Sequence, residues 1–406
     1  MKEKIFTKNF WLSFIALCCC AMVMYMLSST ITEYASEFTD AAVLAGMVSG
    51  MYAFAGMMSR MASNGILKRF GWKKFGVCAA LLHFVACCLY FFPSNIGSLI
   101  ILRFIHGLGF GAINNIILTV GMSILPKSRY AEASGYFSLP SIMAIALGPY
   151  VGGLIKDNLG SAGCFVAAAL LCFGAVICTL MLDVSDETVG VGKAVQATVE
   201  KPKGLNCLLE VSAIPLCLCL TLLVLGFTSV VSFYREYAVQ TGLETVFSYF
   251  FIIYAIVLLC IRTFIGRAQD KFGDNYICYA SIVFQAIGLF LIAWRPCTAT
   301  VIICSLCFVL GYGTLQPCIN AIVTGHAPGH RRSYAVTSVF LFMDFGLGIG
   351  PMIMGGVSDI FGGHRAMYYA AAVLAVLALP LYHFVWGRRG DTAVRVNGKP
   401  REVKSK

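Results

Sequence analysis

Two ionisable side chains lie inside apolar stretches, where they can do chemistry. Asp344 is the only acid deep within any stretch, and Arg103 interrupts a second apolar region. Burial favours a protonated carboxyl and a nearby cation favours its charged form, so an Asp in an alternately hydrated cavity takes up and releases a proton. We predict that Asp344 serves proton coupling and that Arg103 pairs with Glu33. The alternatives are a fixed ion pair or interhelical hydrogen bond for Asp344, and a contact with an anionic substrate group or snorkelling to the headgroups for Arg103.

Further polar residues recur at helical spacing. Tyr312, Gln316 and Asn320 stand at i, i+4 and i+8 on one helix face, and Asn114 follows Arg103 by eleven residues, close to three turns. Polar residues are costly in hydrocarbon unless they face a cavity or a partner. We predict that they line a cavity for a small amphipathic organic solute; a satisfied interhelical network is the alternative. The other predicted lining residues are polar or aromatic: Asn114, His106, Tyr234, Tyr249 and Tyr254.

The elements that must hold these residues are membrane-spanning helices. Hydrophobic residues make up 59% of the chain, charged residues 12%, and the mean hydropathy is +0.82. That is more apolar surface than a soluble core buries. A crossing needs about 20 residues, so the stretches between charges predict twelve helices, at 10–31, 41–62, 75–92, 97–123, 132–155, 161–182, 211–234, 245–265, 276–295, 298–323, 333–358 and 364–386.

The basic residues indicate the orientation of these helices. With both ends inside, only Lys156, Arg235, Arg295 and Arg365 of the 30 Lys and Arg residues face outward, and Arg103 lies within a span. The net charge of +11 then reflects contact with anionic lipid and requires no nucleic acid. Most of the 18 cysteines fall in apolar runs, so we interpret them as packing residues and predict no metal site and no cofactor.

The chain repeats itself at an offset of 202 residues. Arg60-x8-Arg69-Phe70-Gly71 recurs as Arg262-x8-Lys271-Phe272-Gly273. Other residues recur at the same offset: Pro126, Arg129, Gly148, Pro149, Asp157 and Gly160 return as Pro328, Arg331, Gly350, Pro351, Asp359 and Gly362. A parallel repeat in a membrane protein places a binding site at the seam between its halves. We predict a domain at 1–183, a cytoplasmic linker at 184–210, a second domain at 211–388 and a basic tail at 389–406.

These features together resemble the major facilitator superfamily, in its drug/proton antiporter and arabinose-efflux-like branch. The resemblance rests on twelve spans in two sixes, on the repeated loop signature, on Arg103-x2-His106-Gly107-x-Gly109, and on Gly148-Pro149-x2-Gly152-Gly153. It covers about residues 8–388. It implies an all-α membrane protein of two pseudo-symmetric six-helix bundles, and a link between the helix 4 arginine and proton coupling.

The resemblance also implies gating elements. The repeated loops act in the family as a cytoplasmic latch, and the glycines of helix 5 are associated with exporters. The predicted gating residues are Arg60, Lys68, Arg69, Gly71, Arg262, Gly266, Arg267, Asp270, Lys271, Gly273, Gly148, Pro149, Gly152, Gly153, Gly350 and Pro351. Lys68 stands where the family has Asp, so the first loop would depend on the second copy or on an acid from the linker. The alternatives are that the loops only fix topology and that the glycines only permit tight packing.

We therefore expect a monomeric secondary transporter of the inner or plasma membrane that exports a small organic compound in exchange for protons. One alternative is a proton-coupled importer of a sugar, organic acid or other metabolite. A membrane-embedded sensor or enzyme on the same fold is an alternative of another class. The chain shows no P-loop and no catalytic cluster, so we predict that it is not an enzyme.

Overall fold

The computed structural model describes residues 5–126, 136–137, 139–189, 209–327, 331–389, 395–396 and 399–400. Within these ranges some side chains lie outside the description, namely those of residues 64, 65, 68, 248, 262, 263, 266, 267, 270, 332, 333, 389, 395, 396, 399 and 400. The gating predictions for Lys68, Arg262, Gly266, Arg267 and Asp270 fall among them. Most of the predicted linker and tail also lies outside the described residues.

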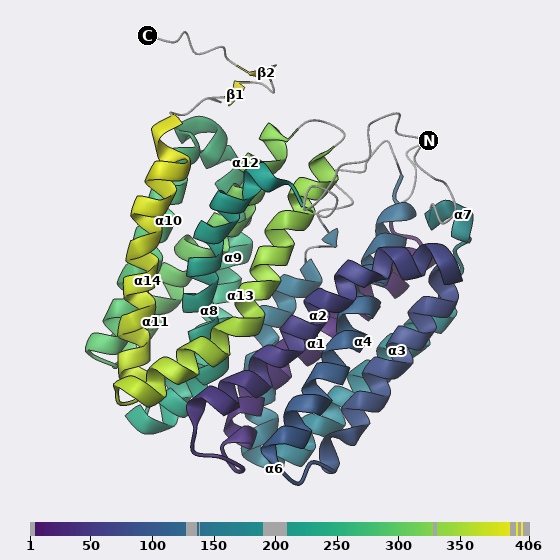
Figure 1. Cartoon of the computed structure of the whole chain (residues 1–406), viewed down its shortest axis with the longest axis horizontal. Coiled ribbons are helices and arrows are strands. Elements are labelled where there is room, and N and C mark those ends of the chain that lie inside the picture. The colour runs from purple at the N-terminus through teal and green to yellow at the C-terminus, as the bar shows by residue number, and fades with distance from the viewer. Residues whose placement is uncertain are drawn as a thin grey trace. The chain divides into compact units, whose positions relative to one another are not determined.

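The chain divides into two compact units, Met1–Thr198 and Val199–Lys406 (Figure 1). The first unit contains α1 (Lys8–Ala35), α2 (Ala42–Phe70), α3 (Trp72–Cys88), the 3-10 turn η1 (Leu89–Phe91), α4 (Ile96–Ser123), α6 (Leu139–Met181) and the short α7 (Asp186–Val189). Local signals start several of these helices. Asn95 and Ser98 form a capping box at the start of α4, and the Thr7 hydroxyl accepts a hydrogen bond from the Phe10 amide at the start of α1.

The second unit repeats this order of long helices. Its elements are the 3-10 turn η4 (Val211–Ala213), α8 (Ile214–Thr241), α9 (Glu244–Phe272), α10 (Asp274–Trp294), α11 (Thr298–Phe308), the π-turn η5 (Val309–Gly313), α12 (Thr314–His326), α13 (Arg332–Phe361), α14 (His364–Val385) and η7 (Gly387–Arg389). A minimal antiparallel pair follows, β1 (Arg395–Val396) with β2 (Lys399–Pro400).

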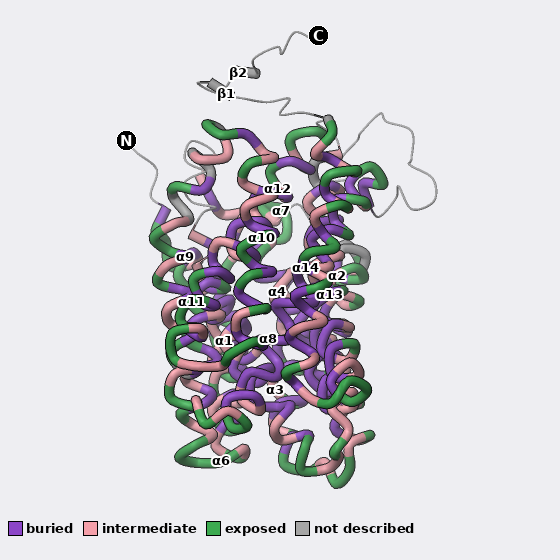
Figure 2. Tube along the Cα trace, turned by 90° about the vertical axis from the view of Figure 1, so that its left-hand side faces the viewer, coloured by how far each residue is buried: buried purple, intermediate pink, exposed green. Residues whose placement is uncertain are grey.

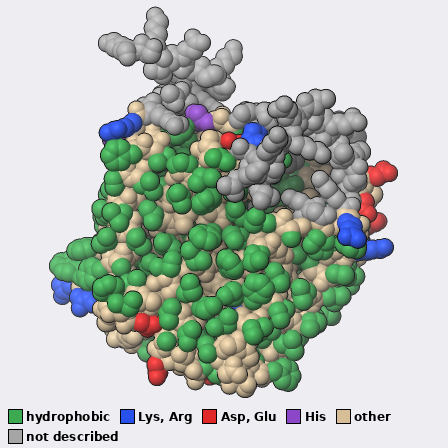
Figure 3. All heavy atoms as spheres, in the orientation of Figure 1, with side chains coloured by type: hydrophobic (Ala, Val, Ile, Leu, Met, Phe, Trp, Pro, Cys, Tyr) green, Lys and Arg blue, Asp and Glu red, His purple; other side chains and the backbone are tan. Residues whose placement is uncertain are grey.

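Eleven helical segments in the described part of the chain are long and apolar enough to cross a membrane. One of them, α6, has 43 residues and is broken at Gly160, whose φ of 68° and ψ of −170° are not helical. It therefore contains two of the predicted spans, which brings the described structure into agreement with twelve. Hydrophobic side chains cover most of the face seen in Figure 3, as lipid contact requires.

The sequence repeat is visible in the backbone. Gly71 and Gly273 end α2 and α9 with φ of 78° and 87°, and Gly160 and Gly362 have φ of 68° and 86°. Residues with a Cβ rarely adopt these conformations, so glycine is needed at both copies. Both α2 and α9 run to these glycines. They are therefore longer than the predicted spans 41–62 and 245–265, because no residue before the glycine breaks the helix.

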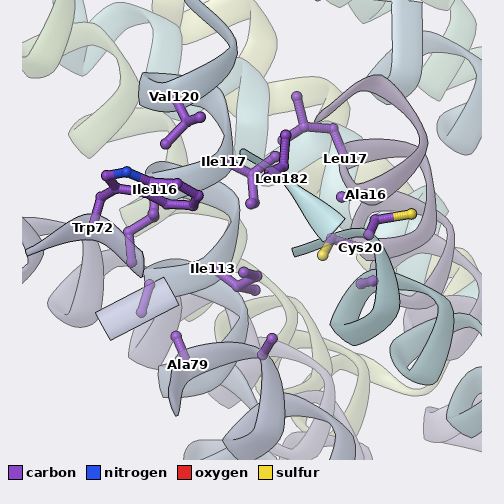
Figure 4. Packing of buried hydrophobic residues seen from close by; sticks show 14 of the residues in the cluster. Ala16, Leu17, Cys20, Trp72, Ala79, Ile113, Ile116, Ile117, Val120 and Leu182 are labelled. Atoms are coloured by element: carbon purple, nitrogen blue, oxygen red, sulfur yellow. The ribbon is translucent and has the colours of Figure 1, made fainter. Parts of the chain in front are cut away.

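Each unit has its own apolar core. Figure 4 shows part of the first core, to which Trp72 of α3, Leu17 of α1 and the α4 residues Ile113, Ile116 and Val120 all contribute. In Figure 2 the buried residues follow the middle of the helices, while exposed residues are common at the helix ends. Each core therefore fixes the side chains that α4 and α8 carry at mid-depth.

Close glycine contacts hold one helix pair in each unit. A Cβ on Gly148 would lie 2.7 Å from the Tyr25 Cβ, and a Cβ on Gly152 would lie 2.9 Å from the Met26 carbonyl oxygen, so α6 packs directly on the α1 backbone. In the second unit, a Cβ on Gly346 would lie 2.8 Å from a Val224 methyl group, so α13 packs equally closely on α8.

Candidate functional site

Arg103 occupies the centre of the first unit and is 0% exposed. Its Nε donates to the Val48 carbonyl at 3.0 Å and its Nη2 to the Ser49 carbonyl at 3.4 Å, both on α2. Its Nη1 donates to the Tyr90 hydroxyl at 3.3 Å, and the guanidinium lies 4.5 Å from the Tyr52 ring centroid. The cation is therefore held by backbone carbonyls, one hydroxyl and one aromatic face.

These contacts correct the expectation that Arg103 pairs with Glu33. Among the described residues the guanidinium contacts no acid, and its complete burial also excludes snorkelling to the headgroups. A helix carbonyl has two lone pairs and accepts a second hydrogen bond beyond its own helix. Arg103 donates hydrogen bonds to two such carbonyls of α2 and thereby joins α4 to α2.

His106 lies beside Arg103 within the same buried cluster. Its Nδ1 lies 3.0 Å from the Tyr90 hydroxyl, and its ring meets the Tyr52 ring edge-on at 4.9 Å. His106 is fully buried inside the first unit, whereas Asn114, two turns further along α4, is half-buried. The structure thus separates two residues that the sequence assigned to one lining: His106 belongs to the core of the unit and Asn114 to its margin.

The predicted aromatic residues of the second unit form a cluster around Phe227 of α8. Tyr312 stacks on Phe227 with centroids 4.2 Å apart, and Tyr254 lies 6.3 Å from the same ring. Tyr234 meets Phe251 edge-on at 5.0 Å. Tyr249 is 50% exposed, because it lies on the other side of α9 from Tyr254, and the structure does not bring it into this cluster.

The predicted polar stripe is interrupted by a π-turn. Residues Val309–Gly313 form this turn, which includes Tyr312, and the extra residue in the turn shifts the helical register. Tyr312 is buried, while Gln316 and Asn320 on the following α12 are half-buried. The i, i+4, i+8 spacing predicted that the three residues share one face of a regular helix. The structure instead places them in different environments.

Asp344 lies on α13 and is 8% exposed. The neighbouring turns pack on α8, where the Thr221 hydroxyl donates to the Phe342 carbonyl at 3.3 Å. Val224 of α8 faces Gly346 of α13 two residues beyond the acid. The carboxyl therefore lies in a closely packed part of a spanning helix, where a charge is costly without compensation.

The turn between α2 and α3 receives its acid from the region that follows α6. The Trp72 amide donates to Asp186 Oδ1 at 2.9 Å, and the Trp72 indole donates to the Val184 carbonyl at 2.8 Å. Lys73 Nζ donates to three carbonyls at the end of α6, those of Thr179, Leu180 and Leu182. Asp186 thus caps α3 beside Gly71, which is one of the two sources of an acid predicted for this loop. Arg60 is half-buried and Arg69 is exposed.

The equivalent turn of the second unit combines a local contact with one to the segment after α14. Gln269 Nε2 donates to Asp274 Oδ1 at 2.8 Å, and Asn275 Nδ2 donates to the Gly387 carbonyl at 3.2 Å. Gly273 has the same backbone conformation as Gly71, and Lys271 is exposed. Asp274 at the first position of α10 therefore serves where the first unit uses the distant Asp186.

An ion pair anchors the start of the second unit. The Arg331 guanidinium hydrogen-bonds the Glu210 carboxylate, and the Ser212 hydroxyl donates to the same group at 2.7 Å. Burial alone would raise the pKa of Glu210, but the hydrogen bonds from Arg331 and Ser212 lower this pKa overall. The pair is therefore charged at neutral pH, and its contribution to stability is lost as the pH falls through the lowered pKa.

Sequence reasoning missed several residues of the buried cluster in the first unit. Tyr52, Tyr90, His83 and Cys172 surround Arg103 and His106, yet none was predicted to act. The sequence contained one signal for Tyr52: it lies 202 residues before Tyr254, which was a predicted lining residue, so the repeat pairs the two positions.

The profile of the Major Facilitator Superfamily matches residues 13–346 and again 216–405. The chain belongs to this superfamily. The match confirms the resemblance on which the sequence predictions rested, and the all-helical bundle fold with it. It also confirms that the protein is a multi-pass membrane transporter and not an enzyme.

Relatives and solved structures agree with this assignment. The chain is 24% identical to the multi-drug resistance efflux pump PmrA of Streptococcus pneumoniae over 83% of this chain and 85% of the relative. It is 25% identical to the multidrug resistance protein MdtG of a Rahnella species, over 86% of each chain. Among solved structures, the nucleoside transporter NupG matches with a TM-score of 0.70 at 15% identity, covering 94% of this chain and 98% of that chain. The proton:xylose symporter XylE matches with a TM-score of 0.66 at 14% identity, covering 93% of this chain and 95% of that chain.

Proposed function

We propose that this transporter exports a small organic compound in exchange for protons. The observation that carries the proposal is Asp344, a carboxyl that is 8% exposed within a spanning helix. Such a group binds a proton when its surroundings are dry and releases it when water or a cation reaches it. Alternating hydration of Asp344 would couple proton movement to the transport cycle.

The direction of transport is supported by the relatives and by α6. PmrA and MdtG both carry names of multidrug efflux or resistance proteins, and each aligns over more than four fifths of this chain. Gly148 and Gly152 of this element lie directly against Tyr25 and Met26 of α1, with no room for a Cβ. Close packing of this kind would resist leakage while one helix moves along the other.

The proposed substrate site combines half-buried polar groups with aromatic walls. In the second unit, Gln316 and Asn320 are half-buried and available to orient a solute, while Tyr254 and Tyr312 supply aromatic surface around Phe227. Few polar groups among aromatic walls suit an amphipathic compound. In this proposal Arg103 does not touch the substrate; it holds α2 and α4 together as one moving body.

The cytoplasmic turns are proposed as the gate. Asp186 and Lys73 tie the first turn to the residues around the end of α6, and Asn275 ties the second turn to Gly387, just after α14. Each tie lies within one unit, so each six-helix bundle would move as a rigid body during the cycle. We further propose that both termini are cytoplasmic and that the protein acts in the cell membrane as a monomer.

Proton-coupled import is the second candidate function. It is favoured by the fold likeness to a proton:xylose symporter and to a nucleoside transporter. At 14–15% identity this likeness supports the fold alone, so it leaves the direction of transport to experiment.

Membrane vesicles of both orientations distinguish the two candidates. A thermal-shift screen of drugs, sugars, nucleosides and amino acids on the purified protein first supplies a substrate, and ethidium serves as a first probe. Inverted vesicles with an acidic lumen should accumulate the substrate, because protons leaving the lumen drive its entry. Accumulation only in right-side-out vesicles with an acidic exterior would establish import instead, and accumulation in neither would refute proton coupling.

A further inference from the structure

Three potential metal ligands from three helices converge in the core of the first unit. His83 of α3, His106 of α4 and Cys172 of α6 each offer one donor atom, and these atoms all lie within 4.8 Å of one another. All three side chains are buried, and the two imidazole rings stack with centroids 4.4 Å apart. A Cβ on Gly109 would lie 2.7 Å from the His83 amide nitrogen, so this glycine allows α3 to approach α4 closely enough for the rings to meet.

The imidazoles in this cluster have unused nitrogens. Neither ring nitrogen of His83 nor Nε2 of His106 has a hydrogen-bond partner among the described residues. Buried polar atoms in proteins nearly always have partners, and an exception calls for an explanation. A shared ligand for the three side chains would satisfy them together.

The fourth imidazole nitrogen, Nδ1 of His106, does have a hydrogen-bond partner. Metal-binding histidines usually hold their second ring nitrogen in a hydrogen bond of this kind. His106 Nδ1 lies 3.0 Å from the Tyr90 hydroxyl, and Arg103 Nη1 donates to the same oxygen at 3.3 Å. A hydroxyl oxygen has two lone pairs and can accept from both. With its proton on Nδ1, His106 presents a free lone pair on Nε2, and Tyr90 orients the ring as an outer partner of the site.

The donor set and the nearby charge together select the ion. One thiolate and two imidazoles suit soft or borderline metals. Arg103 brings a fixed positive charge to the Tyr90 hydroxyl, and the surroundings are the apolar interior of a helical bundle. A divalent ion with one thiolate would leave an extra positive charge there, whereas a monovalent ion with one thiolate is neutral, and uncompensated charge is costly in such surroundings.

We propose that His83, His106 and Cys172 form a three-coordinate site for a soft monovalent metal ion, with Cu(I) as its natural type and Ag(I) as a redox-inert substitute. Binding replaces the proton of the Cys172 thiol, which is released to solution, and involves no change of oxidation state. The site lies about 15 to 18 Å along its helices, near the middle of a bilayer core of about 30 Å. It shares no residue with the proposed substrate site, and its occupancy is measured without transport.

Anaerobic titration of the purified full-length protein with Cu(I) tests the proposal. In the presence of the chelator bicinchoninate, one equivalent of Cu(I) should remain on the protein, as measured by mass spectrometry of the metal. X-ray absorption of that sample should show two nitrogen ligands and one sulfur ligand. A shell of sulfur alone would show that other cysteines hold the ion and would overturn the proposal, as would displacement of the bound Cu(I) by equimolar Zn(II).

Substitutions show which residues hold the one equivalent of Cu(I). His83→Gln, His106→Gln and Cys172→Ser should each weaken retention of this Cu(I) at least tenfold, while His383→Gln and Cys178→Ser should retain it. The two histidine variants change no thiol, so they separate this site from the remaining cysteines. Size-exclusion and melting profiles identify any variant that fails to fold, and the absorption spectrum of the wild type then decides alone. Retention of the equivalent in the folded histidine variants would refute the site.

Discussion

The two units fasten equivalent helices at equivalent positions, but with side chains of different charge. In the first unit Arg103 Nε of α4 donates to the Val48 carbonyl of α2 at 3.0 Å. At the repeat offset, the Ser305 hydroxyl of α11 donates to the Phe250 carbonyl of α9 at 2.7 Å. The repeat therefore preserves the link between the helices while the charge of the linking group is free to change.

Ionisable groups as a whole are distributed differently between the units. His83 packs against Gly109 in the first unit, and Gln285 packs against Gly311 at the matching positions of the second. The buried carboxyl shows the reverse, because Asp344 in the second unit corresponds to an isoleucine at position 142 in the first. The comparison shows the same scaffold in both units, with a buried cation, Arg103, in the first and a buried carboxyl, Asp344, in the second. The following predictions test this difference.

The largest expected effect is at the acid found only in the second unit. Asp344→Asn should reduce proton-driven transport to background while leaving folding intact, since an amide cannot exchange a proton. Asp359→Asn, at an exposed position near the end of the same helix, should keep transport near the wild-type level. Uptake into energised vesicles measures both variants, and proton-driven uptake by Asp344→Asn would remove this acid from the mechanism.

Next comes the paired substitution of the two links. Arg103→Ala should destabilise the protein by about 3 kcal/mol, because it removes three hydrogen bonds and leaves a cavity. Ser305→Ala should cost about 1 kcal/mol, the value of one buried hydrogen bond. Denaturation of the purified proteins in detergent measures the difference. Equal costs would mean that the two links are energetically equivalent despite their chemistry.

A third comparison concerns transport rather than stability. Arg103→Ala should impair transport more than Lys156→Ala. The Lys156 side chain is 11% exposed and pairs with Glu37 at 3.6 Å, but the Glu37 side chain is 57% exposed. A pair with such an exposed partner is worth about 0 to 1 kcal/mol. Similar transport rates for the two variants would count against a role for the buried cation.

The smallest difference between matched variants is expected at the repeated glycines. Gly160 has ψ of −170°, a region that only glycine readily occupies, whereas Gly362 lies in the left-handed helical region with ψ of 38°. Gly160→Ala should therefore cost about 2 kcal/mol and Gly362→Ala about 1 kcal/mol. Thermal melting of both variants measures the costs, and a larger loss at Gly362 would show that backbone conformation does not set them.

Much of the fold could be predicted from the sequence, because membrane spans are set by length and by charge-free composition. The glycines that end α2, α9 and α13 could also be identified, because they recur in the sequence repeat. The cluster of His83, His106 and Cys172 could not be predicted, since it depends on how three helices rotate about their axes. The partners of Arg103 are backbone carbonyls, which leave no sequence signal, and the π-turn at Tyr312 changes a register that residue spacing assumes to be regular.

Proton movement driven by substrate tests the central claim most directly. The purified protein is placed in liposomes that contain a pH-sensitive dye, and a substrate from the thermal-shift screen is added outside. Exchange for protons predicts that the lumen becomes more alkaline as substrate enters, and that Asp344→Asn abolishes this change. Acidification of the lumen would show symport, and substrate entry with no change of luminal pH would contradict coupling through Asp344.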